Sequence, residues 1–371
     1  MGAIIPISVA DSPLSQQLIQ AGLTRLHQGK VRDTFLLPNP LLGKRSMELF
    51  VRDSFLPPDC QLLLQLATDR VSIFDFVLPA LVQDKGQILT ALTVFWLKGP
   101  LAEFNHHLVA AGKEIDQYLP IALRNNSALQ ASALVVKKLK IVPVECIVRG
   151  YLTGSGWTSY QKNGMVCGIQ LPKGLRNGDQ LLVPIFTPTT KAESGHDEHL
   201  DAQAVVERYG TFLRALSLDI YNAAAEYARS RGIIIADFKL EFGDNGVLAD
   251  EVVTPDSSRF WHKDDWEAAL AKGETPKSQD KEYVRDWGRG MKTPFVHVRS
   301  KGFTGMEIIG PTVTGIQNLN PKYSEHLKFI GSLEVPKEVL IETAGRYRDI
   351  FQQLTGSDLH DFQLQNLGII G

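Results

Sequence analysis

Residues 233–250, IIIADFKLEFGDNGVLAD, place charged side chains directly after an apolar run. Residues 233–236 are apolar on both faces of an extended chain, so we expect a buried strand there. Successive side chains of a strand point to opposite faces, which puts Asp237, Lys239 and Glu241 on one face. The segment therefore predicts a strand that carries a row of alternating charge out of the core.

A turn at residues 243–246 is expected to return the chain as an antiparallel strand, with Asp250 beside Glu241. Mg²⁺ prefers oxygen ligands and is commonly held by one or two carboxylates together with substrate phosphates. The ammonium of Lys239 would then offset charge on those phosphates. The polar face of a hairpin with cross-strand ion pairs fits the same residues, and the pattern leaves both interpretations open.

Two further segments combine cations with glycine. In residues 29–33, GKVRD, two cations two residues apart on a strand would point to one face and could hold a polyphosphate. An exposed strand edge with solvated charges is the alternative. Residues 148–157, VRGYLTGSGW, end an apolar strand at Arg149 and continue into a glycine-rich loop, which suits a phosphorylated or carboxylated small molecule. A plain connection between elements would have the same composition.

Polar loops supply two weaker candidates. The hydroxyl-rich segment 186–197 contains Lys191, which has no obvious structural task, and ends near His196 and His199. The two histidines are spaced for a metal, although a capping region for the following helix is the stronger interpretation. Arg259 follows the carboxylate strand and could clamp a substrate phosphate, or the turn could carry only an aromatic anchor.

Composition narrows the class of protein. The 371 residues suffice for two lobes, and 44% apolar and 22% charged residues are ordinary for a soluble globular protein. A net charge of -2 gives no general attraction to nucleic acid or an anionic membrane. Three cysteines without a CxxC pair, no membrane-length apolar run and no cationic leader favour a cytoplasmic protein. The P-loop and dinucleotide-binding glycine motifs are missing from the sequence.

Periodicity and turn residues predict the elements coarsely. We expect helices at 14–26, 88–98, 202–231 and, as the last one, 335–354. We expect strands at 62–68, 133–136, 141–148, 233–238, 240–242 and 247–253. We expect a hairpin loop at 38–43, a loop at 150–156, a partial surface insertion within 101–134 and a loop insertion at 302–320.

The order of seven segments along the chain resembles the SAICAR synthetase (phosphoribosylaminoimidazole-succinocarboxamide synthase) family, most closely its long, fungal-like monofunctional form. The segments are GKVRD (29–33), ATDRVSIFD (67–75), KKLKIVPVECIVRGYLTGSGW (137–157), FTPTTKAESGHDEH (186–199), DFKLEFG (237–243), DEVVTPDSSRFW (250–261) and DKEYVRDW (280–287). The chain departs from the family pattern in a longer stretch at 101–132, an inserted stretch at 290–333, and Gln279 where an aromatic residue is expected.

The resemblance implies an α+β fold of two lobes with the nucleotide in the cleft between them. Residues 1–140 would form a smaller β-rich ATP-binding lobe of ATP-grasp-like or kinase-like character. Residues 141–371 would form a larger α+β lobe with the ribonucleotide site, the metal carboxylates and the C-terminal helix. ATP and Mg²⁺ are the implied cofactors, and the expected partners are small-molecule substrates, with no nucleic acid and no membrane. The protein is expected to be a monomer or a small homo-oligomer.

The resemblance also assigns roles to residues. ATP would be bound by Gly29, Lys30, Val31, Arg32, Leu139, Ile141, Glu145 and Lys239, and Mg²⁺ by Glu241 and Asp250. The imidazole ribonucleotide would be held by Arg149, Ser155, Asp237 and Arg259, and the catalytic group would comprise Lys30, Arg32, Asp237 and Lys239. We predict in addition that Lys191 holds a carboxylate of aspartate.

The implied reaction joins L-aspartate to carboxyaminoimidazole ribonucleotide (CAIR) through an acyl phosphate. A small-molecule or protein kinase is the rival enzyme class, but the sequence contains neither His-Arg-Asp nor Asp-Phe-Gly. A nucleotide-sensing or scaffold module is the rival without catalysis, and it predicts ATP binding without turnover.

Overall fold

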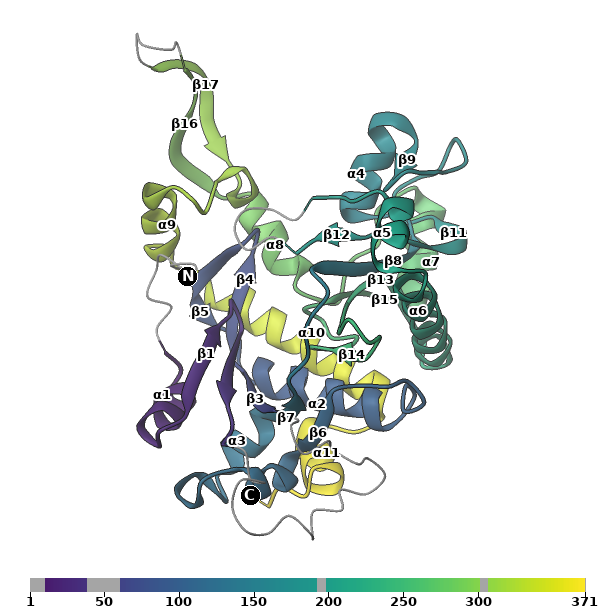
Figure 1. Ribbon diagram of the computed structural model, residues 1–371. Coiled ribbons are helices and arrows are strands. Elements are labelled where there is room, and N and C mark those ends of the chain that lie inside the picture. Colours follow the sequence, from purple (N-terminus) through teal and green to yellow (C-terminus); the bar gives the residue numbers. More distant parts are fainter. Residues whose placement is uncertain (1–10, 39–60, 192–197, 301–305, 371) are drawn as a thin grey trace.

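The computed structural model describes residues 11–38, 61–191, 198–300 and 306–370 (Figure 1). It contains two main sheets, one formed by strands within residues 24–137 and the other by strands within residues 144–262, and helices join and cover them. The α+β expectation is therefore confirmed. Within the described residues, no helix is both long and apolar enough to cross a membrane.

The first sheet is antiparallel, with strand order β1-β2-β3-β7-β6. Its strands are β1 (Thr24–Gln28), β2 (Arg32–Leu36), β3 (Leu62–Ala67), β6 (Leu108–Ala111) and β7 (Ala133–Lys137). Alternation along β3 buries Leu62, Leu64 and Leu66 on one face. This face packs with α1 (Pro13–Gln20) and α3 (Ser127–Ser132) in one apolar cluster.

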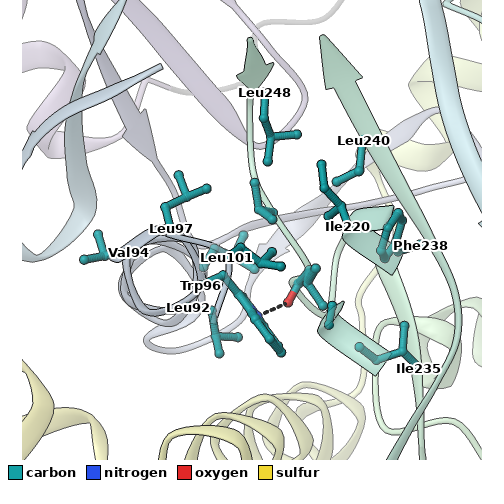
Figure 2. Close-up of a cluster of buried hydrophobic side chains, with 14 of the residues drawn as sticks. Leu92, Val94, Trp96, Leu97, Leu101, Ile220, Ile235, Phe238, Leu240 and Leu248 are labelled. Atoms are coloured by element: carbon teal, nitrogen blue, oxygen red, sulfur yellow. Dashed lines mark hydrogen bonds between the residues drawn. The ribbon is translucent and has the colours of Figure 1, made fainter. Parts of the chain in front are cut away.

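The helix α2 (Lys85–Lys98) lies in the centre of the molecule, after the hairpin of β4 (Arg70–Ile73) and β5 (Phe76–Leu81). It is buried almost all round, because it packs against both main sheets. Figure 2 shows Trp96 of α2 among side chains from the second sheet and its covering helix. The indole of Trp96 donates a 3.0 Å hydrogen bond to the carbonyl of Val253, which fixes the chain just beyond the carboxylate hairpin.

The second sheet has the order β11-β8-β13-β14, with β12 paired to β8 and β15 paired to β13. Its strands are β8 (Val144–Tyr151), β11 (Gln180–Phe186), β12 (Thr189–Thr190), β13 (Ile233–Phe242), β14 (Leu248–Ala249) and β15 (Ser258–His262). The helix α6 (Phe212–Ser230) packs on the sheet through Ile220 and Tyr221. Smaller elements beside it are α4 (Gly154–Asn163), β9 (Met165–Val166), β10 (Ile169–Gln170), α5 (Ala202–Tyr209) and α7 (Lys263–Lys272).

The C-terminal part returns to the centre of the molecule. It comprises α8 (Glu282–Arg289), β16 (Lys292–Ser300), β17 (Met306–Thr314), α9 (Ser324–Gly331), α10 (Lys337–Thr355) and α11 (Leu359–Asn366). Strands β16 and β17 form a hairpin that projects from the rest of the chain (Figure 1). Tyr347 and Phe351 of α10 and Phe362 of α11 share the buried cluster with Trp96 of α2. The described residues also contain 3-10 turns at Gly112–Tyr118, Ile121–Leu123 and Ile316–Asn318.

Several predicted loops were wrong because they are ordered elements. Residues 101–134, expected to be in part a surface insertion, contain β6, α3 and two 3-10 turns that bury Ile115 and Leu129 under the first sheet, although Ile121 is 82% exposed. Residues 306–314 of the expected loop insertion form β17, and 301–305 lie outside the described residues. The expected loop at 150–156 is the end of β8 followed by the start of α4. The hairpin loop at 38–43 lies outside the described residues beyond Pro38.

Helix and strand boundaries also differ from the prediction. Gly210, with φ of 95°, interrupts the periodic segment 202–231 and separates α5 from α6. The segment 14–26 is helical only to Gln20 and then enters β1, and α11 follows the helix expected to be last. The two strands expected in 233–242 are one strand, β13. The strand expected at 247–253 is confined to Leu248–Ala249, because Asp250 and Val253 have positive φ and cannot continue it.

Replacing Phe351 by alanine tests the packing of α10 against α2. Phe351 is 1% exposed, so Phe351→Ala should lower the free energy of unfolding by about 3–5 kcal/mol through lost burial and a residual cavity. Ile341→Ala on the same helix, 71% exposed, should change it by no more than about 0.5 kcal/mol. Chemical denaturation measures both; similar values for the two variants would contradict this packing.

Candidate active site

The hairpin predicted from residues 233–250 is present as β13 and β14. Glu241 pairs with Ala249 across it, so Asp250 follows immediately beside the charged row of β13. Asp250 has φ of 60°, a left-handed conformation that non-glycine residues seldom adopt. The turn thus brings the Glu241 and Asp250 carboxylates into the same charged cluster, as the strand pattern predicted.

The two carboxylates affect each other. Burial raises the pKa of Glu241, and the nearby charge of Asp250 raises it further, against the opposing effect of Lys191. Burial also disfavours the charged form of Asp250, but Arg32 and Lys191 outweigh it and hold the Asp250 pKa below its ordinary value. A pair of oxygen ligands that repel each other is a suitable setting for a divalent cation.

Each of these carboxylates has a cationic partner from a different part of the chain. Arg32, at the start of β2, forms an ion pair with Asp250 and a second one, of 3.2 Å, with Glu251. Lys191, just after β12, pairs with Glu241. The cluster therefore joins the first sheet to the second through opposite charges.

Lys239 is paired with Glu145 of the neighbouring strand β8, at 2.5 Å. Burial works against the charge on Lys239, but Glu145 and Glu241 raise its pKa above the ordinary value, so the ammonium stays protonated. Glu145, which the family resemblance assigned to ATP binding, has its side chain 10% exposed and also accepts a 3.3 Å hydrogen bond from Thr189.

The prediction that Lys30 and Arg32 share one strand face was wrong. Lys30 lies in the turn between β1 and β2 and pairs with Asp75 of the β4–β5 turn, whereas Arg32 begins β2 and pairs with Asp250. A backbone hydrogen bond of 2.8 Å from Gly29 to the carbonyl of Arg32 closes the turn. The side chains of Lys30 and Arg32 therefore reach different partners instead of sharing one strand face.

Residues that the sequence did not single out hold this turn in place. The carbonyl of Val31 accepts hydrogen bonds from the backbone and hydroxyl of Thr68, at 3.0 and 2.8 Å. Arg70 donates to the carbonyl of Gly29 at 3.2 Å and forms a buried 2.5 Å ion pair with Asp33. The feature of the sequence that could have pointed to these residues is the segment ATDRVSIFD, which contains Thr68, Arg70 and Asp75.

The segment between the two sheets, residues 138–143, runs beside the β13–β14 turn. Val142 donates a 2.8 Å hydrogen bond to the carbonyl of Phe242, and Asp244 donates a 2.9 Å bond to that of Lys140. Ile141 forms an isolated bridge with Gly243, and Leu139 lies close to the same glycine. Leu139 and Ile141 are therefore adjacent in space to the carboxylate hairpin.

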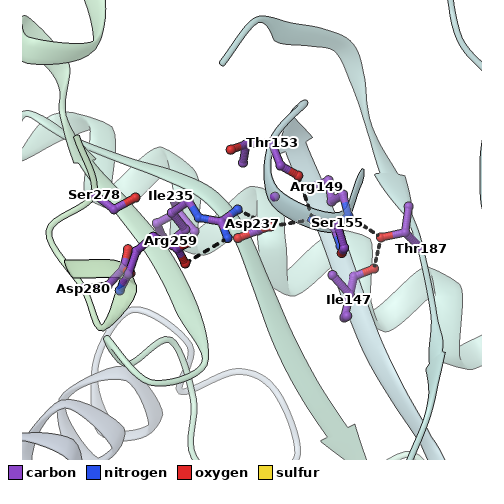
Figure 3. Close-up of polar contacts among 12 residues, drawn as sticks. Ile147, Arg149, Thr153, Ser155, Thr187, Ile235, Asp237, Arg259, Ser278 and Asp280 are labelled. Carbon is purple, nitrogen blue, oxygen red and sulfur yellow. Dashed lines mark hydrogen bonds and ion pairs between the residues drawn. The ribbon is translucent and has the colours of Figure 1, made fainter. Parts of the chain in front are cut away.

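Asp237 lies between two arginines from the strands on either side of it. The register places Asp237 opposite Arg149 of β8 and opposite Arg259 of β15. Its Oδ2 is 2.6 Å from Nη1 of Arg149 and 3.0 Å from Nη1 of Arg259, as Figure 3 shows. Three of the four residues predicted to hold the ribonucleotide thus form one ion-pair triad.

Ser155 completes this group. Arg149 donates from Nη2 to the hydroxyl of Ser155 at 2.9 Å and from Nε to Thr187 at 3.0 Å (Figure 3). The glycines around Ser155 leave room for the arginines. A Cβ on Gly154 would lie 2.8 Å from the terminal nitrogens of Arg259, and one on Gly156 would lie 3.0 Å from Cδ of Arg149.

The alternative metal pair of histidines finds no support in the described residues. His196 lies outside them, and Nε2 of His199 is 3.3 Å from the hydroxyl of Ser155. Among the residues that the structure describes, no three or more His, Cys, Asp or Glu side chains are grouped to hold a metal by themselves. A cation at Glu241 and Asp250 would therefore depend on a ligand for its remaining oxygens.

Comparisons with a family model and with known proteins all point to one family. The family model described as SAICAR synthetase matches residues 50–301. The phosphoribosylaminoimidazole-succinocarboxamide synthase of Stenotrophomonas maltophilia (strain K279a) is 40% identical over 338 residues, covering 87% of this chain and 99% of that protein. The protein of the same name from Rhodococcus jostii is 49% identical over 249 residues, covering 65% and 80% of the two chains.

Solved structures that resemble this chain carry the same family name. The SAICAR synthase of Saccharomyces cerevisiae, complexed with SAICAR, has a TM-score of 0.65 and 31% identity, and the match covers 91% of this chain and 96% of that one. A SAICAR synthetase in complex with ADP shares the fold at a TM-score of 0.52 and 21% identity, over 90% and 98% of the chains. This chain belongs to the SAICAR synthetase family.

Proposed function

We propose that this chain is an ATP-dependent ligase of purine biosynthesis that joins L-aspartate to CAIR, giving SAICAR, ADP and phosphate. One observation supports the proposal: a single strand, β13, supplies residues to both halves of the proposed site. Asp237, which organises the two arginines, and Lys239 are two residues apart on one strand face. A strand rises about 3.3 Å per residue, so a ribonucleotide at the arginines would lie within reach of a phosphoryl group at Lys239.

The chemistry requires activation of a carboxylate. An oxygen of the CAIR carboxylate attacks the γ-phosphorus of ATP, which forms an acyl phosphate and releases ADP. The amine of aspartate then attacks the acyl carbon, loses a proton, and expels phosphate to leave an amide. Lys30, Arg32 and Lys239 would offset charge on the phosphoryl oxygens, and Arg149, Arg259 and Ser155 would orient the ribonucleotide.

Mg²⁺ fits the donor set of Glu241 and Asp250. Both are carboxylates, they are close enough for the charge of Asp250 to raise the pKa of Glu241, and Arg32 and Lys191 already adjoin them. When bound, Mg²⁺ would neutralise phosphate charge and would take its remaining ligands from ATP and water. Lys30, Arg32 and Lys239 would hold the phosphates in place around the bound Mg²⁺.

The remaining assignments follow from the family. ATP would lie in the cleft between the lobes, with its adenine against the segment that includes Leu139 and Ile141 and its phosphates near Gly29, Lys30, Val31 and Arg32. We place the lobe boundary near residue 140, with the smaller lobe before it, and note that α10 packs on α2 of that lobe. We also propose a cytosolic location and a monomer or small homo-oligomer.

An assay of ADP release tests the function directly. Steady-state ADP release should require CAIR, ATP and aspartate together, and SAICAR should accumulate in equal amount. Sustained ADP release without aspartate would indicate a kinase or an ATPase. ATP binding without turnover under any combination of substrates would indicate a nucleotide-sensing module.

Amide variants test the metal carboxylates. Glu241→Gln and Asp250→Asn keep side-chain shape and remove one charge each, so we expect kcat to fall at least a hundredfold and the Mg²⁺ requirement to rise. Asp244→Asn is the matched control, because Asp244 lies in the same hairpin, is half exposed and pairs only at the surface with Lys140. Normal turnover of both site variants at limiting Mg²⁺, with lowered melting temperatures, would mean that the two carboxylates serve only the fold.

Lys191 is proposed to contact the aspartate substrate as well as Glu241. An ammonium has three donors, so an ion pair with Glu241 leaves it able to meet a second carboxylate. Lys191→Met should raise the KM for aspartate about tenfold at saturating Mg²⁺, a loss of roughly 1.4 kcal/mol. An unchanged aspartate KM would restrict Lys191 to the pairing with Glu241.

A further inference from the structure

The helix α8 carries a carboxylate that faces three guanidinium groups and that has no part in the reaction described above. Oε2 of Glu282 lies 3.5 Å from Nη2 of Arg259 and 3.0 Å from Nη1 of Arg285, and Oε1 pairs with Arg289. The side chains of Glu282 and Arg259 are 15% and 13% exposed, so their pair is shielded from water, whereas those of Arg285 and Arg289 are 31% and 41% exposed. Removing the charge of Glu282 would cost stability, because Arg259, Arg285 and Arg289 would each lose an anionic partner.

Arg259 is held from two sides. Its Nη1 is 3.0 Å from Asp237, and its Nη2 faces Glu282. Asp237 is shared, since it is 2.6 Å from Arg149. Glu282 is therefore the carboxylate that Arg259 does not share with Arg149, and it lies beside Nη2, the guanidinium nitrogen that does not face Asp237.

The position of Glu282 is itself fixed at the start of α8. The carboxyl group of Asp280 accepts a 3.0 Å hydrogen bond from the backbone of Phe260, the residue after Arg259, and a 2.8 Å bond from the backbone of Glu282. Asp280 is 2% exposed, and burial raises its pKa to about 7. These bonds connect the first turn of α8 directly to β15.

The far end of α8 is anchored on the β4–β5 hairpin. Gly288 packs so closely that a Cβ there would lie 2.6 Å from Cδ1 of Ile73. The guanidinium of Arg289, which also pairs with Glu282, lies 5.5 Å from the ring centroid of Phe74. The next residue, Asp75, is the partner of Lys30 in the proposed phosphate turn. The carboxylate of Glu282 is thus supported from both lobes.

We propose that Glu282 is a positioning residue that fixes the guanidinium of Arg259 for the imidazole ribonucleotide. The inference rests on the proposed function, because it takes Arg259 as a contact of that substrate. An arginine side chain has several rotatable bonds, and holding it in place before the substrate arrives reduces the ordering cost of binding. The residue acts on substrate affinity through Arg259 and does not touch the reacting atoms.

The test compares Glu282→Gln with Asp286→Asn. Asp286 lies on the same helix and also pairs with Arg289, but its side chain is 66% exposed, so this pair lies at the surface. Glu282→Gln should raise the KM for CAIR at least tenfold, leave the KM values for ATP and aspartate within twofold, and change kcat less than the CAIR KM. Asp286→Asn should leave all of these within twofold. Equal CAIR KM values for the two variants would overturn the proposal.

A double-mutant cycle with Arg259→Gln separates positioning from a general effect on the fold. If Glu282 acts through Arg259, Glu282→Gln should add less than twofold to the CAIR KM once Arg259 is already replaced. The full tenfold rise in that background would overturn the proposal. Glu282→Asp keeps the charge and shortens the side chain, so it should recover part of the affinity; it also replaces Glu282→Gln in the cycle should that variant not fold.

Calorimetric titration with CAIR separates this proposal from the proposed function, because it needs no turnover. The Kd for CAIR should rise at least tenfold from the unchanged chain to Glu282→Gln. An unchanged chain that binds CAIR but forms no SAICAR would contradict the proposed function alone. Equal Kd values would contradict the positioning role alone.

Discussion

The pairing of Asp237 with two arginines from neighbouring strands is the interaction on which the rest of the site depends. Arg149 and Arg259 come from strands on opposite sides of β13, and both are largely buried. Without the carboxylate between them, two guanidinium groups would face each other away from water, which is strongly unfavourable. The strand register that places Asp237 opposite both arginines therefore brings the two guanidinium groups to one place, where we propose that the anionic ribonucleotide binds.

The same strand then sets the geometry of the second half of the site. Lys239 and Glu241 follow Asp237 on the same face, and the β13–β14 turn adds Asp250. Arg32 reaches this cluster from the first sheet, so the charges that would meet ATP and Mg²⁺ come from both lobes. Trp96 supports the arrangement through its hydrogen bond to the carbonyl of Val253, within the apolar cluster of Figure 2.

Much of this could be predicted from local patterns. Alternation along β13 was enough to place Asp237, Lys239 and Glu241 together, and the glycine turn was enough to return Asp250. The pattern failed at Lys30, because a closed turn at Gly29 redirects the side chain toward Asp75. The glycines at 150–156 predicted a loop, but Gly154 and Gly156 lie in the first turn of α4, where arginine side chains pack against them.

Partners that are distant in sequence could not be predicted in this way. Glu145 with Lys239, Lys191 with Glu241, and Glu282 with Arg259 are each brought together only by the assembled sheets and helices. No periodicity within one segment contains that information. The family resemblance named most of the residues in these pairs, but it did not indicate which of them pair with one another.

The central claim is that one strand brings the ribonucleotide carboxylate to the γ-phosphoryl group of ATP. Isotope transfer measures this most directly. With both carboxylate oxygens of CAIR labelled with ¹⁸O, one labelled oxygen should appear in the inorganic phosphate released in each turnover, because it bridges carbon and phosphorus in the acyl phosphate. Phosphate that carries no label, formed while SAICAR accumulates, would contradict the account.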